Sequence, residues 1–261
     1  MPDRPSARLD RSDHPRTRSG LRTAVVWDVL RPALAAHVSA TGRGSLDVLD
    51  TGGGTGGFAV PLAQEGHRVT VVDPSPDSLA ALDRRAAEAG VTDRVTGVQG
   101  EAAGLLDVVA PDSADLALCH SVLEFVDEPA AALAAVVRAT RSGGLVSVLA
   151  ANPHAVVLAR AASGQFAAAR HVLGDPDGRW GDADPTPRRF TLEQVSDLLA
   201  AAGLAIRAVH GVRVFVDLVP GELVESEPGA YDALRALEAD VAERPAFRDV
   251  ATQLHLLAER G

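Results

Sequence analysis

The sequence predicts an α/β fold with a doubly wound, mostly parallel sheet of seven strands, in the manner of Rossmann-like folds. Short β-type runs alternate with segments of helical periodicity along most of the chain. The run Ala114 to His120 is almost continuously apolar, which is typical of a strand covered on both faces. A glycine cluster follows the first predicted strand. Because crossovers between parallel strands are right-handed, this alternation favours a doubly wound sheet.

The first half of the chain supplies three strands and three helices. Apolar residues recur at helical spacing from Leu21 to Ala40, which predicts a helix. Glycines 66 and 90 each follow a helical segment, in the position where glycine commonly ends a helix. The expected order is helix 21–40, strand 46–50, helix 58–65, strand 68–73, helix 74–89 and strand 94–98.

The second half continues the alternation and then departs from it. An insertion at about 152–189 interrupts the pattern with a short helical segment and a turn-rich stretch. Thr191 and Gln194 form the pattern of a capping box at a helix start. The segment 252–259 fits a last strand or, nearly as well, a short helix. The remaining expected elements are strand 114–120, helix 129–141, strand 144–151, helix 156–170, helix 191–202, one or two strands in 204–216, and helix 230–243.

Composition excludes several classes of protein. The 261 residues include 35 acidic and 25 basic side chains, none of them lysine, and the formal net charge is −10. Such a chain is not a generic binder of polyanions. The single cysteine, Cys119, excludes an intrachain disulfide and a cysteine-rich zinc site, and it suits the cytoplasm. The histidines lack metal-ligand spacing, so no metal is expected. We find no membrane-spanning run and no secretory signal.

The glycine cluster is the strongest functional signal, and it fits two cofactors. Gly52, Gly54 and Gly57 match the dinucleotide pattern G-x-G-x-x-G. Asp50, Gly52, Gly54 and Gly56 also match D-x-G-x-G-x-G, the pattern of S-adenosylmethionine binding. A carboxylate at the tip of the first strand would repel a pyrophosphate but suits a cationic cofactor, so Asp50 favours S-adenosylmethionine. Asp73, which ends the second strand, could hold the ribose of either ligand.

Segments further along strengthen this interpretation. Gly100-Glu101-Ala102-Ala103 follows the third strand, where such folds hold the adenine edge, and His120 ends the fourth strand. Arg141-Ser-Gly-Gly144 precedes the fifth strand. From Leu46 to Ala151 the sequence resembles the class I S-adenosylmethionine-dependent methyltransferases. The resemblance implies one methyltransferase domain over 21–261, with the insertion at about 152–189. The composition of residues 1–20, rich in Arg, Asp, Pro and Ser, predicts a flexible N-terminal segment.

A closer resemblance extends from about Gly20 to the C-terminus. It is carried by Leu21-Arg22 through Trp27, His120-Ser-Val-Leu-Glu-Phe125, Asn152-Pro-His154, Ser163-Gly-Gln-Phe166, Gly211-Val-Arg-Val-Phe215, Tyr231-Asp-Ala-Leu and Leu237-Glu238. In this order the segments resemble the tRNA 5-carboxymethoxyuridine methyltransferase family, which esterifies the carboxylate of that wobble nucleoside. The resemblance implies the tRNA anticodon loop as partner. It implies cofactor contacts from Arg22 to the methionine carboxylate, from Gly52 and Gly53 in the loop, from Asp73 to the ribose, from Ala102 and Ala103 to the adenine, and from His120.

A carboxylate acceptor needs no catalytic base, because it is already ionised at neutral pH. The site needs a cation to hold that carboxylate, preferably an arginine fork. Arg189 and Arg213 are the candidates.

The insertion departs from the family pattern, which can carry a basic run there. Gly174 to Asp184 contains four aspartates and one arginine, which favours a small acid or another small metabolite as an alternative acceptor on the same fold. A non-catalytic binder of S-adenosylmethionine and a nicotinamide-dependent oxidoreductase are further alternatives.

Overall fold

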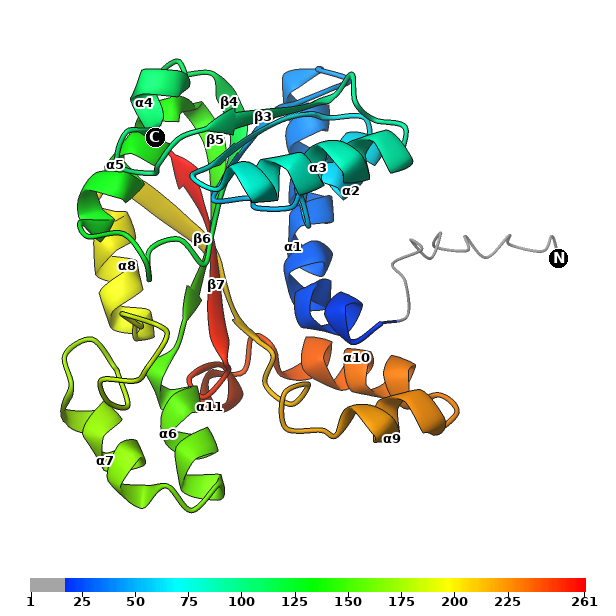
Figure 1. The fold of residues 1–261 in the computed structure, drawn as a ribbon. Coiled ribbons are helices and arrows are strands. Elements are labelled where there is room, and N and C mark those ends of the chain that lie inside the picture. Colours follow the sequence, from blue (N-terminus) through cyan, green and yellow to red (C-terminus); the bar gives the residue numbers. More distant parts are fainter. Residues whose placement is uncertain (1–16) are drawn as a thin grey trace, which may run out of the picture.

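The computed structural model describes residues 17–261 as one open sheet between layers of helices (Figure 1). The strand order is β3-β2-β1-β4-β5-β7-β6. Strands β1 to β5 pair in parallel, whereas β7 is antiparallel to both β5 and β6. The predicted doubly wound, mostly parallel seven-stranded sheet is confirmed. The strands are β1 (Asp47–Thr51), β2 (Arg68–Asp73), β3 (Val95–Gln99), β4 (Ala114–His120), β5 (Thr140–Ala151), β6 (Leu204–Val212) and β7 (Gln253–Arg260).

Helices cover both faces of the sheet and one of its ends (Figure 1). Helices α4, α5 and α8 lie on one face, and α1, α2 and α3 lie on the other. Helices α6, α7, α9 and α10 gather where β5 ends. The helices are α1 (Arg18–Thr41), α2 (Ala59–Gln64), α3 (Pro76–Glu88), α4 (Leu105–Val108), α5 (Pro129–Ala139), α6 (Pro153–Ala162), α7 (Phe166–Gly174), α8 (Leu192–Ala201), α9 (Gly221–Ser226), α10 (Ala230–Val241) and α11 (Pro245–Arg248).

Two apolar clusters fix these layers. One packs Leu133 and Val136 of α5 and Leu199 of α8 against β4, β5 and β7. The other packs helices α1, α2 and α3 against the opposite face of the sheet. The central strand β4 is buried on both sides, as its continuous apolar run predicts. The sheet is therefore a rigid frame, and its loops are free to carry the functional groups.

The capping box is confirmed, because Thr191 and Gln194 exchange side-chain to backbone hydrogen bonds at the start of α8. The ambiguous segment at the C-terminus is the strand β7. The helix predicted over 156–170 is wrong in its extent. It is two helices, α6 and α7, separated at Gly164, whose φ of +73° is incompatible with a continuous helix.

Other boundaries differ by smaller amounts. The helix predicted to reach Arg141 ends at Ala139, and β5 begins at once with Thr140. The strand predicted within 204–216 ends at Val212, and the short helices α4, α9 and α11 were not predicted. The predicted flexible segment 1–20 lies mostly outside the described residues, but residues 18–20 form the first turn of α1.

Candidate active site

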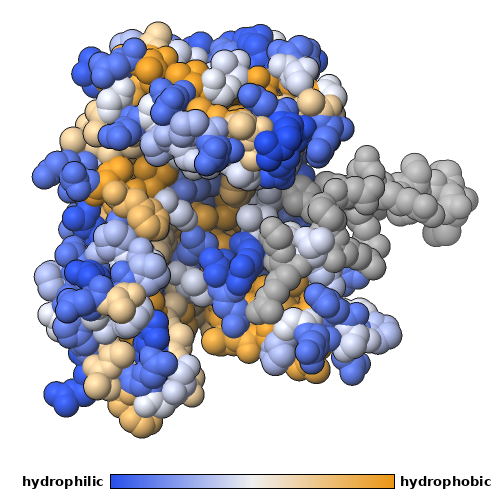
Figure 2. Space-filling model, viewed as in Figure 1, coloured by the Kyte–Doolittle hydropathy of each residue, from blue (hydrophilic) through white to orange (hydrophobic). Residues whose placement is uncertain are grey.

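The direction of winding reverses between β1 and β4. The chain runs from β1 outward to β2 and β3, then returns to place β4 on the other side of β1. Ligands of doubly wound sheets bind outside the carboxyl ends of the strands at such a reversal. Figure 2 shows that this face is hollowed between the lobe of α6 and α7 and the lobe of α9 and α10.

A cavity of about 310 Å³ lies at this reversal, and we call it the glycine-loop cavity. It brings together side chains and backbone from α1, β1, the following loop, the end of β4 and the segment after β6. Six predicted site residues line it: Arg22, Asp50, Gly52, Gly53, His120 and Arg213. The lining also includes Gly57, which the sequence placed only in the competing dinucleotide pattern, and five residues that were not predicted: Thr23, Phe58, Ser121, Leu149 and Gln253.

Three glycines of the loop stand where a Cβ atom would collide with a neighbouring side chain. A Cβ on Gly53 would lie 2.4 Å from Oδ2 of Asp50, so any larger residue would displace that carboxylate. Gly52 has a φ of +68°, and its Cβ would lie 2.6 Å from the side chain of Val122. Gly56 has a different role, because its Cβ would lie 2.3 Å from the Leu82 side chain. Gly56 therefore allows the loop to pack against α3 and does not line the cavity.

Asp73 fixes the loop from the neighbouring strand. Its Oδ2 accepts a hydrogen bond from the backbone N–H of Gly54 at 2.9 Å, and its Oδ1 accepts one from Ser75. Each carboxylate oxygen retains a lone pair for a further donor, such as a ribose hydroxyl. The backbone N–H of Gly100 donates to the carbonyl of Asp73 at 3.2 Å. The segment of Glu101, Ala102 and Ala103 therefore begins beside Asp73, with Ala102 buried and the other two exposed.

Asp50 is a buried carboxylate that faces the glycine-loop cavity with one oxygen unsatisfied. Its side chain is 2% exposed, and no residue within 17–261 donates a hydrogen bond to its Oδ2. Burial, together with the negative charge of Asp73, raises the pKa of Asp50 to about 7. An unpartnered buried carboxylate is costly unless a cation or donor meets it. Asp50 is therefore suited to a positively charged ligand group.

His120 is held as a neutral imidazole. Its Nε2 lies 2.8 Å from Oγ of Ser147, and Oγ lies 2.8 Å from Nε2 of His255. Burial lowers the pKa of His120 to about 3. The ring packs edge-on against Phe58, with centroids 4.7 Å apart. A neutral ring at the cavity wall neither repels a cationic ligand nor binds a carboxylate by charge.

Asp217 joins two arginines that are far apart in the sequence. Arg22 of α1 donates to Oδ1 of Asp217 from Nε at 3.1 Å and from Nη2 at 2.9 Å. Arg213, which follows β6, donates from Nε to Oδ2 at 2.7 Å. Arg213 also donates to Gln253, whose amide in turn donates to Ser121. Both guanidinium groups are thereby held at the rim of the glycine-loop cavity.

Arg189 is placed differently from Arg213. It forms a two-pronged ion pair with Asp184, at 2.7 and 3.0 Å, and both side chains are buried. A third bond joins Arg189 to the carbonyl of Gly178. Burial alone would raise the pKa of Asp184, but hydrogen bonds from Arg189 and from backbone N–H groups lower it below its ordinary value. Arg189 is buried against Asp184, whereas Arg213 lines the glycine-loop cavity, so Arg213 is the better candidate for a carboxylate clamp.

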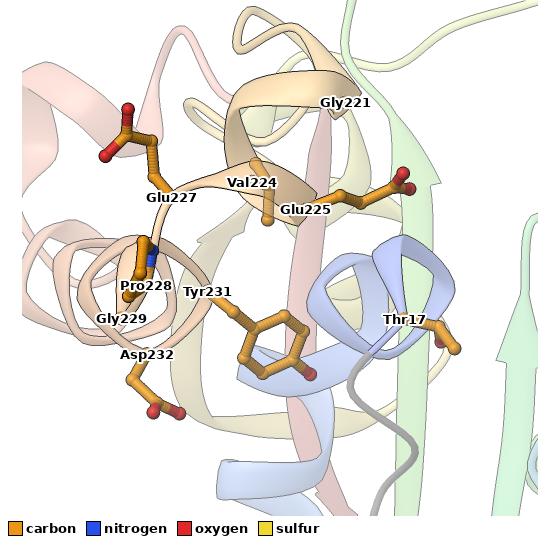
Figure 3. Close-up of a pocket in the computed structure, with 9 residues that line it drawn as sticks. All are labelled: Thr17, Gly221, Val224, Glu225, Glu227, Pro228, Gly229, Tyr231 and Asp232. Carbon is orange, nitrogen blue, oxygen red and sulfur yellow. The ribbon is translucent and has the colours of Figure 1, made fainter.

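A larger cavity of about 450 Å³ lies away from these residues, between the start of α1 and helices α9 and α10 (Figure 3). Its acidic side chains Glu225, Glu227 and Asp232 point in different directions, and Tyr231 points toward α1 (Figure 3). They do not converge on one ligand. None of the predicted site residues lines this cavity.

Among residues 17–261, no group of three or more His, Cys, Asp or Glu side chains is arranged to hold a metal ion. Across the same residues, every helix is too short or too polar to cross a bilayer. Cys119 is fully buried in β4, and burial raises the pKa of its thiol to about 12.

The fold and the glycine loop together define the class of protein. Residues 49–148 match the family described as methyltransferase domain. An S-adenosylmethionine-dependent methyltransferase from Mesorhizobium loti has a similar structure, with a TM-score of 0.57, 20% identity, and coverage of 92% of this chain and 100% of that one. One from Methanosarcina mazei gives a TM-score of 0.59 at 15% identity, covering 88% and 97%. The chain is an S-adenosylmethionine-dependent methyltransferase.

Two relatives are similar over almost the whole length. The tRNA 5-carboxymethoxyuridine methyltransferase of Escherichia coli O157:H7 is 29% identical over 97% of this chain and 93% of its own. That of Escherichia coli strain K12 is 28% identical over the same shares.

The lining of the glycine-loop cavity fits S-adenosylmethionine. The orphaned Oδ2 of Asp50 suits its ammonium group, and the glycines leave the loop open to close approach. The neutral His120 suits a site for a sulfonium, because it adds no positive charge. Arg22 brings a guanidinium group to the same cavity, and such a group suits a carboxylate like that of the methionine moiety. When bound, the cofactor supplies a methyl group on a positively charged sulfur.

Proposed function

We propose that this protein methylates the carboxylate of 5-carboxymethoxyuridine in tRNA, in the cytoplasm. The observation that carries this proposal is the meeting of Arg22 and Arg213 at one cavity, joined by Asp217. The reaction involves two carboxylates, one on the methionine part of the cofactor and one on the acceptor. Two guanidinium groups at the same rim match that requirement. The full-length similarity to the two E. coli enzymes supports the same acceptor.

The chemistry asks little of the protein beyond binding and orientation. A carboxylate is ionised at neutral pH, so no residue has to remove a proton before it accepts a methyl group. The half-buried imidazole of His120 is neutral, and this proposal assigns it no proton transfer. Holding the acceptor in line with the methyl group is the main contribution expected of the enzyme.

Each predicted site residue except Arg189 has a role in this proposal. Arg22 binds the methionine carboxylate, Asp50 binds the ammonium, and Arg213 binds the acceptor carboxylate. The remaining cofactor contacts are proposed for the loop glycines 52, 53 and 54, for Asp73 at the ribose, for Glu101, Ala102 and Ala103 at the adenine, and for His120. Gly56 contributes through packing against α3.

The acidic insertion is compatible with an anticodon loop because three of its four aspartates are engaged internally. Asp184 is neutralised by Arg189, and Asp177 pairs with Arg188 at 3.2 Å. Asp175 accepts hydrogen bonds from two backbone N–H groups of its own turn. These carboxylates organise the insertion, so they present less free negative charge to a phosphate backbone than the sequence suggests.

Mass spectrometry of tRNA nucleosides tests the proposal directly. Cells with and without this protein should differ in the methyl ester of 5-carboxymethoxyuridine, with the free acid accumulating in its absence. Purified protein should also methylate an anticodon stem-loop that carries the free acid. An unchanged ester content in cells, together with an inert stem-loop, would refute the assignment. Binding of S-adenosylhomocysteine without any acceptor methylation would favour a non-catalytic binder.

Two arginine variants test the division of roles. Arg22→Met should weaken binding of S-adenosylhomocysteine, whereas Arg213→Met should raise the KM for the stem-loop and lower kcat with less effect on that binding. Arg170→Met is a matched control, because Arg170 is exposed on α7 and lines neither the cavity nor its rim. Equal effects of the two variants on cofactor binding would contradict the assigned roles.

A small acid remains the second candidate acceptor. The formal charge of −10 opposes association with a polyanion and favours a compact substrate. Turnover of small carboxylic acids with no turnover of the stem-loop would establish this alternative.

A further inference from the structure

A second cavity of about 280 Å³ lies under α6, and we call it the α6 cavity. Val156 and Arg160 of α6 form one side, and Trp180 and Arg189 of the insertion form another. Thr252, just before β7, also lines it. Residues from the insertion after β5 therefore enclose a space at the carboxyl end of the sheet, where α/β enzymes place their substrates.

The α6 cavity adjoins the glycine-loop cavity through a shared wall. Asp217 lines the α6 cavity and accepts hydrogen bonds from Arg22 and Arg213, which both line the glycine-loop cavity. Thr252 lines the α6 cavity and donates from Oγ1 to the carbonyl of Arg213 at 2.9 Å. A group bound in the α6 cavity can therefore direct a substituent toward Arg213 and the cofactor.

One wall of the α6 cavity is flat and aromatic. The guanidinium carbon of Arg160 lies 3.9 Å from the centroid of the Trp180 ring, so the two planar groups form a cation–π pair. Arg160 is also held by a 2.6 Å hydrogen bond to Gln165. Such a surface suits a planar heterocycle, since nucleobases stack on aromatic rings and on guanidinium planes.

The insertion holds this wall in place from behind. The backbone N–H of Trp180 donates to Oδ2 of Asp184 at 3.0 Å, and Asp184 is fixed by its two bonds to Arg189. The indole is therefore positioned by a buried ion pair and not by a mobile surface turn. Asp184 of the acidic insertion therefore holds the aromatic wall of the α6 cavity in place, a role that its negative charge alone does not suggest.

We propose that the α6 cavity holds the pyrimidine ring of the acceptor nucleoside, stacked on the Trp180–Arg160 pair, with its 5-substituent directed toward Arg213. The inference rests on the proposed function, because that function makes the acceptor a nucleoside. The cavity volume of about 280 Å³ lies just below the roughly 300–1,000 Å³ typical of pockets for drug-sized ligands, which suits a single substituted ring better than a larger molecule.

Fluorescence and kinetics of Trp180 variants test the inference. Trp27 and Trp180 are the only tryptophans, and Trp27 is buried against α2, where it stacks on Phe58. Titration with a 5-carboxymethoxyuridine stem-loop, in the presence of S-adenosylhomocysteine, should quench the wild type, and the quenching should be absent in Trp180→Leu. The KM of Trp180→Leu for the stem-loop should rise about tenfold or more, while Trp180→Phe retains most of the affinity.

Controls separate stacking from folding. The Kd for S-adenosylhomocysteine and the thermal midpoint should be nearly unchanged in Trp180→Leu, because the side chain is partly exposed and the turn is fixed through its backbone. Arg160→Leu should also raise the KM, whereas Arg170→Leu on the neighbouring helix should not. An unchanged KM in Trp180→Leu, with an active wild type, would overturn the inference and leave the proposed function standing.

Failure of the proposed function gives a different result. In that case the wild type would not methylate the stem-loop, whatever stands at position 180. Titration with the free nucleoside 5-carboxymethoxyuridine then tests the α6 cavity independently of turnover. Quenching that disappears in Trp180→Leu supports the stacking site, and absence of quenching in the wild type refutes it.

Discussion

The protonation of Asp50 should control the affinity of the glycine-loop cavity near neutral pH. Its burial and the charge of Asp73 raise its pKa to about 7. A ligand ammonium requires the ionised carboxylate, so affinity should fall as the pH falls through 7. S-adenosylhomocysteine is the appropriate probe, because it has the ammonium and the carboxylate but no transferable methyl group.

The expected size of the effect follows from one titrating group. With a pKa of about 7, roughly half of the Asp50 population is ionised at pH 7 and about one tenth at pH 6. The apparent Kd should therefore rise about fivefold from pH 7 to pH 6 and about ninefold more from pH 6 to pH 5. The ligand amine stays protonated over this range, since α-amino groups titrate near pH 8.

Calorimetry at several pH values between 5 and 7 measures this dependence. Two buffers with different ionisation enthalpies should report release of about half a proton at pH 7, as linkage requires. Asp50→Asn keeps the volume of the side chain and removes the titration, so its weaker binding should vary little with pH. A wild-type Kd that stays constant over this range would refute the reasoning. The same slope in Asp50→Asn would assign the proton to another group.

Three further predictions concern the scaffold. Gly53→Ala should raise the Kd for S-adenosylhomocysteine about tenfold or more, because its Cβ would lie 2.4 Å from Asp50 Oδ2; unaltered calorimetric binding would contradict this. Arg189→Met should lower the free energy of unfolding in urea by about 3–5 kcal/mol, because it leaves the Asp184 carboxylate buried without its cation. The double variant Arg189→Met/Asp184→Leu should recover much of that stability. A wild-type unfolding midpoint for Arg189→Met would disprove the burial argument. The buried Cys119 should react with a thiol reagent slowly in the native protein and quickly in denaturant, and rapid native labelling would count against it.

The regular part of the fold was predictable because local and long-range forces agree there. The run from Ala114 to His120 is apolar, β-favouring and central, and the observed strand has the same bounds. The insertion was predicted less well, because its helices are short and break at Gly164. Its turns depend on aspartate side chains that accept backbone hydrogen bonds, as Asp175 and Asp184 do. Such contacts are specified by geometry and leave no periodic pattern in the sequence.

The candidate site also contains some residues that the sequence predicts and others that only the structure brings in. The glycine pattern and Asp50 carry a strong local signal, and they meet in one cavity with Arg22. Asp217 carries no such signal, because it lies in an irregular segment 195 residues from Arg22. Arg189 and Arg213 could not be separated by sequence alone. Both are arginines near the ends of regular elements, and only the buried partner of Arg189 distinguishes them.

The unusual composition of the chain is connected with this site. Without lysine, the basic side chains are all guanidinium groups, which are planar forks that bind best when their orientation is fixed. Carboxylates provide that orientation here, since Asp184 fixes Arg189 and Asp217 fixes both Arg22 and Arg213. Asp184 and Asp217 add to the negative charge that opposes nucleic-acid binding, but they also fix the orientation of the arginines at the two cavities. For this chain the positions of the arginines are a better guide to an anionic substrate than the net charge is.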